Sequence, residues 1–236
     1  MVEIMSCLSL ILDTETHTLN GYPIEIAYLP ITLEQQILHT DQTGIFDEYY
    51  SLDADTSIHF ASMAVHHILP QDLLNKPSFR QFRLPQDCIY LIGHNIDYDI
   101  QAIARCGQSI QHIKPICTLA LARYLWPQLE SHSLSSLSYF ISDDFEKTRE
   151  MLRNAHNAKT DILLTAILLQ KIITLLNIDN IGALYQQSQL ARLPQFMPFG
   201  KYKGYPLTDI PIDYVQWLLR QDNLDPYLKQ ALEQTF

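Results

Sequence analysis

Three separate stretches of this chain offer side chains that could bind metal ions together. The first holds Asp13 and Glu15, the second holds Asp99, and the third holds His156 and Asp161. Hydrolysis of a phosphodiester by two metal ions needs such a set, because carboxylate oxygens bind Mg²⁺ or Mn²⁺ and a histidine can take a proton from water. The three stretches therefore predict one hydrolytic metal site.

The first stretch ends a short apolar run that is typical of a buried strand. Asp13 and Glu15 are two residues apart, so both side chains leave the same face of that strand. They could share one cation or hold two cations side by side. Two acids at this spacing are common by chance, and alone they are as easily a solvent-facing pair.

The second stretch follows a predicted strand that ends at Gly93. Asp97 and Asp99 cannot both face the site, because residues two apart on a helix diverge. We expect Asp99 to point back towards the edge of the sheet, while Asn95 or Asp97 caps the helix. The alternative interpretation makes both acids ordinary first-turn residues that complement the helix dipole.

The third stretch places a histidine five residues before an acid. On one helix, His156 and Asp161 would diverge by about 140°. A shared site therefore requires His156 in the preceding loop and Asp161 on the helix, with Asn157 as the helix cap. From that loop the histidine could deprotonate the attacking water, since its pKa lies near neutrality.

Hydrophobic patterning predicts the elements that position these residues. Strands are predicted over residues 8–12, 24–29, 45–52, 88–92 and 113–117, and helices over 60–68, 71–82, 95–107, 119–126, 134–140 and 160–176. Strands in a meander, followed by strands alternating with helices, predict an α/β fold with a mixed five-stranded sheet flanked by helices.

A boundary is predicted near residue 178, which gives a main domain over 1–178 and a small C-terminal α+β module over 179–236. We expect the module to contain a helix, a hairpin over 199–207 and two closing helices. Lys201 and Lys203 alternate with aromatic residues in that hairpin. They could hold a nucleic-acid strand by phosphate contact and base stacking, or simply face water while the aromatics dock on the main domain.

Composition limits the class of protein. The chain has 236 residues and a net charge of −10, which argues against a nucleic-acid partner until bound divalent cations are considered. The four cysteines form no C-x-x-C pair, so a zinc ribbon is not expected. Residues 1–5 lack a basic leader, and no apolar run is long enough to span a membrane. We expect a cytoplasmic protein without a membrane partner; the oligomeric state stays open.

The order of the motifs resembles the DEDDh group of 3′→5′ exonucleases. Its first motif matches Asp13 and Glu15, its second matches His94 to Asp99 with Tyr98 in place of phenylalanine, and its third matches His156 and Asp161. Within that group the likeness is greatest to the bacterial exonuclease X type. It extends to residues 58–68, 116–127 and 199–204, and so covers most of the chain.

This resemblance implies a ribonuclease H-like fold and release of nucleoside 5′-monophosphates from the 3′ end of DNA. It also implies two Mg²⁺ ions, for which Mn²⁺ can substitute. By the same resemblance the metal ligands are Asp13, Glu15, Asp99 and Asp161, and the general base is His156.

A substrate-binding set is expected as well: Thr16, His17, Leu19, His94, Asn95, Lys201 and Lys203. The resemblance points to Leu19 within this set, whereas Lys201 and Lys203 belong to it because they alternate with aromatic residues. Leu19 and His17 are expected near the terminal base. The family often has glycine where this chain has Thr18, which could alter that fit. Two alternatives stay open. One is an exoribonuclease with the same chemistry, because motif spacing does not reveal contacts to the 2′-hydroxyl. The other is a non-catalytic nucleic-acid-binding or polymerase-associated subunit.

Overall fold

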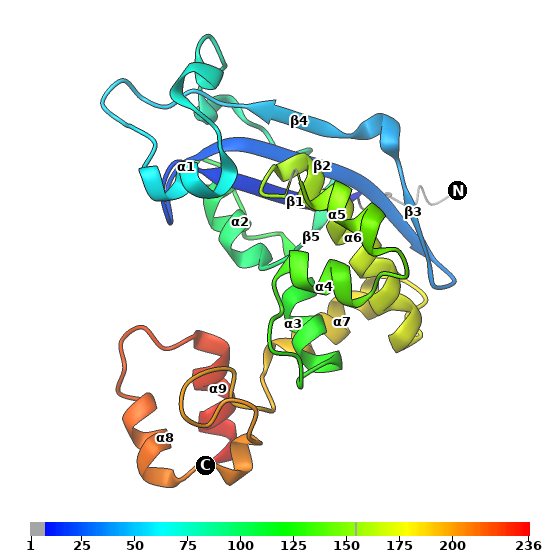
Figure 1. Cartoon of the computed structure of the whole chain (residues 1–236), viewed down its shortest axis with the longest axis vertical. Helices are drawn as coiled ribbons and strands as arrows, with labels where there is room; N and C mark the ends of the chain where they lie inside the picture. The colour runs from blue at the N-terminus through cyan, green and yellow to red at the C-terminus, as the bar shows by residue number, and fades with distance from the viewer. Residues whose placement is uncertain (1–7, 154) are drawn as a thin grey trace.

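A six-stranded mixed sheet forms the centre of the protein in this computed structural model, which describes residues 8–153 and 155–236 (Figure 1). The strands are β1 Leu8–Thr16, β2 Pro23–Glu34, β3 Ile37–Thr40, β4 Phe46–Tyr49, β5 Cys88–Gly93 and β6 Lys114–Cys117. Their order is β3-β2-β1-β5-β6, with β4 also paired to β2. Residues 1–5, for which we expected no basic leader, and Cys7 lie outside the described residues.

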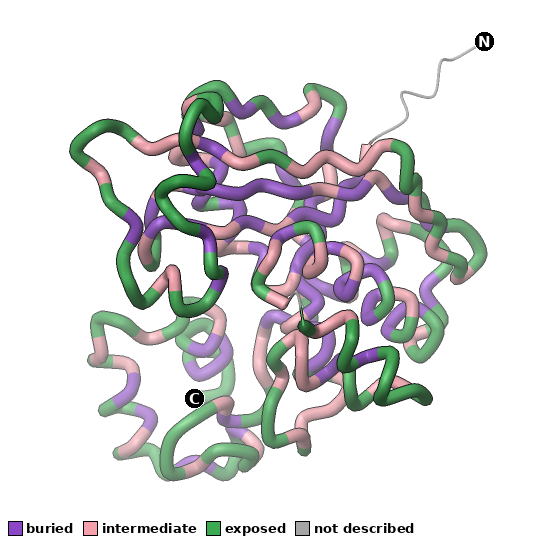
Figure 2. The backbone as a smooth tube through the Cα atoms, turned by 45° about the horizontal axis from the view of Figure 1, so that its top comes forward, coloured by how far each residue is buried: buried purple, intermediate pink, exposed green. Residues whose placement is uncertain are grey.

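The strand that carries the first two acids runs through the middle of this sheet. β1 is antiparallel to β2 on one side and parallel to β5 on the other. Its residues Leu10, Ile11 and Leu12 have no exposed surface, and buried positions concentrate in the sheet and the helices against it (Figure 2). Burial on both faces explains why this strand reads as a continuous apolar run instead of alternating.

Nine α-helices surround or follow the sheet in the described residues: α1 Phe60–His66, α2 Ile96–Ala104, α3 Thr118–Leu125, α4 Leu134–Phe140, α5 Phe145–Leu152, α6 Ala158–Leu176, α7 Ile181–Arg192, α8 Ile212–Leu218 and α9 Pro226–Thr235. The longest, α6, packs against β1, β2 and β3, while α2 packs against β1, β5 and β6. None of the described helices has the length and apolar content needed to cross a membrane.

The α/β class and the mixed strand direction are confirmed, but several predicted elements are wrong. The sheet has six strands and not five, because β3 (Ile37–Thr40) pairs with β2. The helix predicted over residues 71–82 is replaced by two 3₁₀ turns, Pro70–Leu73 and Phe79–Gln81. Pro77 lies between them, and proline cannot continue a helical hydrogen-bond ladder.

The C-terminal part contains helices and turns, so its predicted α+β character is wrong. In place of the hairpin over 199–207, an isolated bridge between Phe196 and Pro206 closes a loop of turns. Gly200 and Gly204 within that loop have φ of 73° and 83°, which a regular strand does not allow. The bridge is followed by a 3₁₀ turn, Leu207–Asp209, and by α8 and α9.

The apolar core of the last forty residues is separate from the clusters of the sheet domain and indicates where the chain divides. Leu184 and Ala191 of α7 belong to the core of the sheet domain, whereas the separate core begins at Met197 and ends at Leu232. The boundary predicted at residue 178 precedes α7. From the packing we propose a boundary between Arg192 and Met197, and we use "C-terminal module" for residues 197–236.

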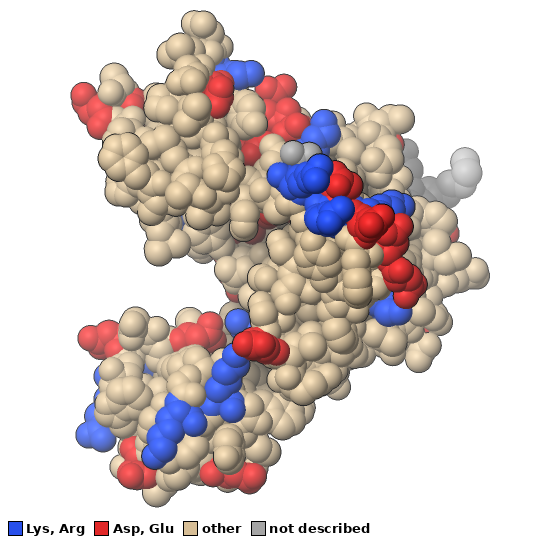
Figure 3. Space-filling model, in the orientation of Figure 1, with Lys and Arg blue, Asp and Glu red and all other residues tan. Residues whose placement is uncertain are grey.

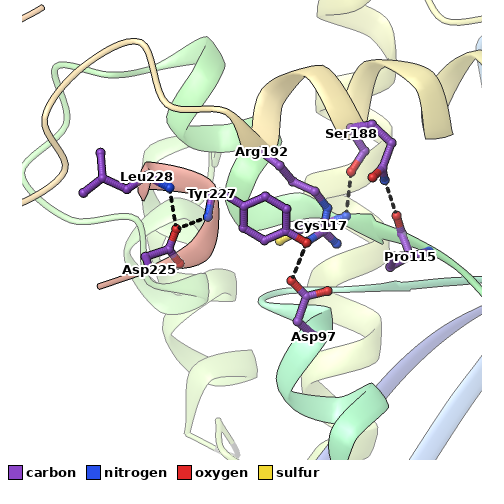
Figure 4. A network of polar contacts seen from close by, with 9 residues as sticks. Asp97, Pro115, Cys117, Ser188, Arg192, Asp225, Tyr227 and Leu228 are labelled. Atoms are coloured by element: carbon purple, nitrogen blue, oxygen red, sulfur yellow. Dashed lines mark hydrogen bonds and ion pairs between the residues drawn. The ribbon is translucent and has the colours of Figure 1, made fainter. Parts of the chain in front are cut away.

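Removing the Ser188 hydroxyl should reveal how firmly α7 belongs to the sheet domain. Buried Ser188 accepts a hydrogen bond from the backbone N–H of Cys117 at 2.8 Å (Figure 4). Ser188→Ala leaves that N–H without its partner and should cost about 1–3 kcal/mol of unfolding free energy. Urea titration measures the loss. Exposed Gln186→Ala, on the same helix, is the control and should change it by less than about 0.5 kcal/mol. Equal effects would contradict the packing argument.

Candidate active site

Acids from one strand and two helices converge at one place. Ligand atoms of Glu15, His156 and Asp161 all lie within 4.8 Å of one another. Asp13 lies two residues before Glu15 on β1, and the pKa of the Asp13 carboxyl is raised by burial and then by the charges of Asp99, Glu15 and Asp161. The four predicted metal ligands are therefore electrostatic neighbours in the folded chain.

Asp99 is fixed against β1 by hydrogen bonds. Its Oδ1 accepts from the backbone N–H of Thr14 at 2.9 Å and from the Thr14 hydroxyl at 2.8 Å. Close approach of β5 to β1 makes this possible, since a Cβ on Gly93 would lie 2.8 Å from the carbonyl oxygen of Leu12. Asn95 then turns the chain into α2 with φ of 74°. The choice of Asp99 over Asp97 follows from these contacts, because Asp97 pairs with Arg192 on another side of the helix.

His156 reaches the site from a loop, as its five-residue separation from Asp161 requires. It has φ of 63°, outside the helical region, and α6 begins two residues later. The side chain of Asn157 caps α6 by accepting from the N–H of Thr160 at 3.2 Å. This turn lets both side chains face one point although they could not do so from one continuous helix.

Burial raises the pKa of each of these acids above its usual range, and repulsion by neighbouring carboxyl groups adds to the rise at Asp13, Glu15 and Asp99. Burial, then the charge of Asp161, raises the pKa of Glu15 to about 9. Burial raises the pKa of Asp99 to about 7 against the opposing Thr14 hydrogen bonds. It raises that of Asp161 to about 6, where the charge of His156 opposes it. Such a cluster is the electrostatic complement of a divalent cation.

A further buried acid, Glu25 on β2, lies beside this cluster and was absent from the sequence prediction. It is 0% exposed and is the cross-strand partner of Glu15. Its carboxylate accepts from Nδ2 of Asn157 at 2.5 Å and from the N–H of Ala158 at 3.2 Å. Glu25 thus anchors the start of α6, next to His156. The sequence offered little indication of this role, because Glu25 is a single acid in an apolar strand with no second acid or histidine near it to form a motif.

The two residues expected near the terminal base, His17 and Leu19, follow β1 in the chain and differ in exposure. Leu19 is 78% exposed and lies in the turn that follows β1. His17 is buried and stacked on Tyr22, and its Nδ1 accepts from the N–H of Tyr22 at 2.9 Å. The Thr16 hydroxyl donates a hydrogen bond to the carbonyl of Thr18 and shares another with the Tyr98 hydroxyl. Leu19 is therefore free to touch a base, whereas His17 and Thr16 shape the loop beneath it.

The other predicted substrate residues are spread more widely. Both ring nitrogens of His94 contact the protein, at the Thr118 hydroxyl (3.0 Å) and the His132 carbonyl (2.8 Å), and burial lowers its pKa to about 4. These contacts favour a structural role for His94. Asn95 is exposed at the start of α2. Lys201 and Lys203 lie on the C-terminal module and do not join the acids.

Comparisons with known proteins match most of the chain to nucleases and its C-terminal residues to a different family. A family model described as exonuclease matches residues 10–169, and one described as "Putative quorum-sensing-regulated virulence factor" matches residues 186–236. Exodeoxyribonuclease 10 of Escherichia coli strains K12 and CFT073 is 25% identical to this chain over 232 residues. That similarity covers 94% of this chain and 96% of the relative.

Solved structures share the fold. Exonuclease X in complex with 5′ overhanging duplex DNA matches with a TM-score of 0.55 at 23% identity, covering 77% of this chain and 98% of that one. E. coli exonuclease I in complex with a dA16 oligonucleotide matches with a TM-score of 0.57 at 17% identity, covering 77% of this chain and 42% of that one. At these identities the likeness is one of architecture.

Proposed function

The chain belongs to the exonuclease family, whose model matches residues 10–169, and on this basis we propose that it is a metal-dependent 3′→5′ exodeoxyribonuclease. Membership confirms the resemblance inferred from the motifs, as well as the ribonuclease H-like fold, and makes the chain a nuclease. The observation that carries the finer proposal is the convergence of the four acids and His156 around one point.

The donor set suits hard divalent cations. Carboxylate oxygens are the ligands that Mg²⁺ and Mn²⁺ prefer. The raised pKa values of Glu15 and Asp99 are what is expected when several carboxyl groups are buried together without a divalent cation. We assign Asp13, Glu15, Asp99 and Asp161 as the ligands of two Mg²⁺, which Mn²⁺ can replace. When bound, the ions would activate the attacking water and stabilise the leaving oxygen.

His156 is the general base of this proposal. It lies in a loop at the rim of the acids, with its ring within 4.8 Å of carboxylate oxygens of Glu15 and Asp161. It would accept the proton of the water that attacks the terminal phosphorus. The bond to the preceding 3′ oxygen then breaks and a nucleoside 5′-monophosphate leaves, while Leu19 packs against the terminal base.

Three described cysteines, Cys88, Cys106 and Cys117, are buried and free. Free thiols suit a reducing compartment, and we propose a cytoplasmic location. The DNA partner is inferred from the curated relatives, which are named as exodeoxyribonucleases.

The test uses the purified chain and single-stranded DNA labelled at its 3′ end. With Mg²⁺ we expect labelled mononucleotides from the first time points, and with EDTA none. An RNA strand of the same sequence should be cut more slowly. Faster cutting of RNA would turn the proposal into an exoribonuclease. Release of the label in longer fragments would contradict attack from the end, and an absence of cutting with either metal would leave a binding subunit.

A further inference from the structure

A groove lies between the sheet domain and the C-terminal module, and none of the four proposed metal ligands lines it. It has a volume of about 650 Å³, within the usual range of ligand sites. Its walls come from α3 and the following loop, from the segment after α7, and from α9. Figure 3 shows the molecule hollowed between these two parts, with Lys and Arg side chains along the edge of the module.

The groove starts at the same helix end as the candidate active site. Asn95 and Asp97 line it, and Asp99 follows one half-turn later on α2. When the 3′-terminal nucleotide of a strand occupies the active site, the rest of the strand, on the 5′ side of that nucleotide, must extend away from the site. The groove lies beside the start of α2, the helix that carries Asp99, and is large enough to receive part of that strand.

Exposed, positively charged side chains and aromatic rings line this groove. Arg123 and Lys203 contribute positive charge, and Tyr124, Phe196 and Phe199 contribute partly exposed rings. Grooves that hold single-stranded nucleic acid combine these two kinds of side chain, cations for phosphates and rings for base stacking.

Three acids also line the groove, and they differ in how far they are free to offset the positive charge of Arg123 and Lys203. Asp225 accepts from the N–H groups of Tyr227 and Leu228 at the start of α9, and Asp97 is paired with Arg192. Glu130 is exposed, and its backbone carbonyl accepts from Nζ of Lys203 at 3.1 Å. Two of the three acids are therefore committed to protein partners, while the guanidinium of Arg123 stays exposed.

A partly buried contact, which we call the latch, ties the C-terminal module to α2. It consists of Asp97, Arg192 and Tyr227 (Figure 4). Nη1 of Arg192 donates to Asp97 and to the Tyr227 hydroxyl, which in turn donates to Asp97 at 3.2 Å. The Arg192 side chain is only 2% exposed, and its guanidinium lies 5.0 Å from the Tyr227 ring centre. The module is thus tied to the helix that carries Asp99.

We propose that the groove binds the segment of a single strand on the 5′ side of the scissile nucleotide, with Arg123 and Lys203 on its phosphates and the latch holding the module as one wall. This rests on the proposed exonuclease function and adds the path of the strand. It also gives a role to Asp97, which the active site does not use.

The experiment compares two substrates with Mg²⁺ present: a long single strand, which can fill the groove, and a dinucleotide, which cannot. Arg123→Glu/Lys203→Glu should raise the KM of the long strand about tenfold, because two phosphate contacts become repulsive. Its binding should also depend less on salt, with the slope of log K against log salt reduced by about 1.4. The ratio of long-strand to dinucleotide kcat/KM should fall in parallel.

Two further variants separate the groove from general charge effects. Lys229→Glu/Arg220→Glu makes the same change in net charge at exposed positions of the module outside the groove, and should leave the ratio near that of the wild type. Tyr227→Phe removes one contact of the latch and should lower the ratio less than the groove variant does. An equal drop in the ratio for both double variants would overturn the proposal.

Failure of the groove and failure of the proposed function give different results. If the wild-type chain cuts both substrates and the groove variant keeps its ratio and salt slope, the strand takes another path and only the groove proposal is overturned. If the wild-type chain cuts neither substrate, the exonuclease proposal itself fails, and the groove proposal with it.

Discussion

Asp13→Asn should abolish measurable nuclease activity and, without metal, make the protein more stable. Asparagine keeps the shape of the side chain but loses a charge that lies among Asp99, Glu15 and Asp161. Losing one ligand of the two metal ions proposed for this site should slow hydrolysis about a thousandfold or more. Removing a buried, repelled carboxyl should raise the free energy of unfolding by about 1–3 kcal/mol at neutral pH.

The measurement pairs a nuclease assay with thermal unfolding in EDTA. The control is Asp55→Asn, which neutralises an exposed acid outside the cluster; both activity and stability should stay close to the wild type. Activity retained by Asp13→Asn would remove Asp13 from the metal site. Lost activity without a gain in stability would mean that the acids do not repel one another as their raised pKa values indicate. Sites that trade stability for activity show both changes together.

The sequence was sufficient for those parts of the site whose geometry is local. Strand periodicity placed Asp13 and Glu15 on one face, and helix periodicity required His156 in a loop. Both follow from spacing within a few residues. Helix geometry also excluded that Asp97 and Asp99 both face the site. The choice of Asp99 came from the resemblance, and in the structure Asp97 pairs with Arg192 instead.

The missing parts depend on contacts between distant residues. Glu25 joins the site only through the register that sets it opposite Glu15 and through Asn157, 132 positions away in the chain. β3 has four residues and no buried side chain, so it has little apolar pattern. Glycines at positive φ turned the predicted hairpin into a closed loop. The latch joins residues 95 and 130 positions apart, which no local pattern predicts.

Mg²⁺ should stabilise the protein strongly at alkaline pH and weakly at acid pH. Folding raises the pKa of Glu15 to about 9, of Asp99 to about 7 and of Asp161 to about 6, all above ordinary carboxyl values. Groups whose pKa is raised by folding bind more protons in the folded state than in the unfolded state. Their contribution to stability is complete below about pH 4 and is lost as pH rises towards about 9.

Cations reverse this loss because they bind the deprotonated carboxylates. Thermal unfolding with and without Mg²⁺, from about pH 5 to about pH 9, should show a melting-temperature gain that grows with pH. At a free concentration of about 100 times Kd the gain corresponds to about 2.7 kcal/mol, or roughly 5–11 °C for a chain of this size. The gain should disappear in Asp161→Asn. If the rise in melting temperature were independent of pH, Mg²⁺ would not be competing with protons for Glu15, Asp99 and Asp161. That result would contradict the raised pKa values of these acids.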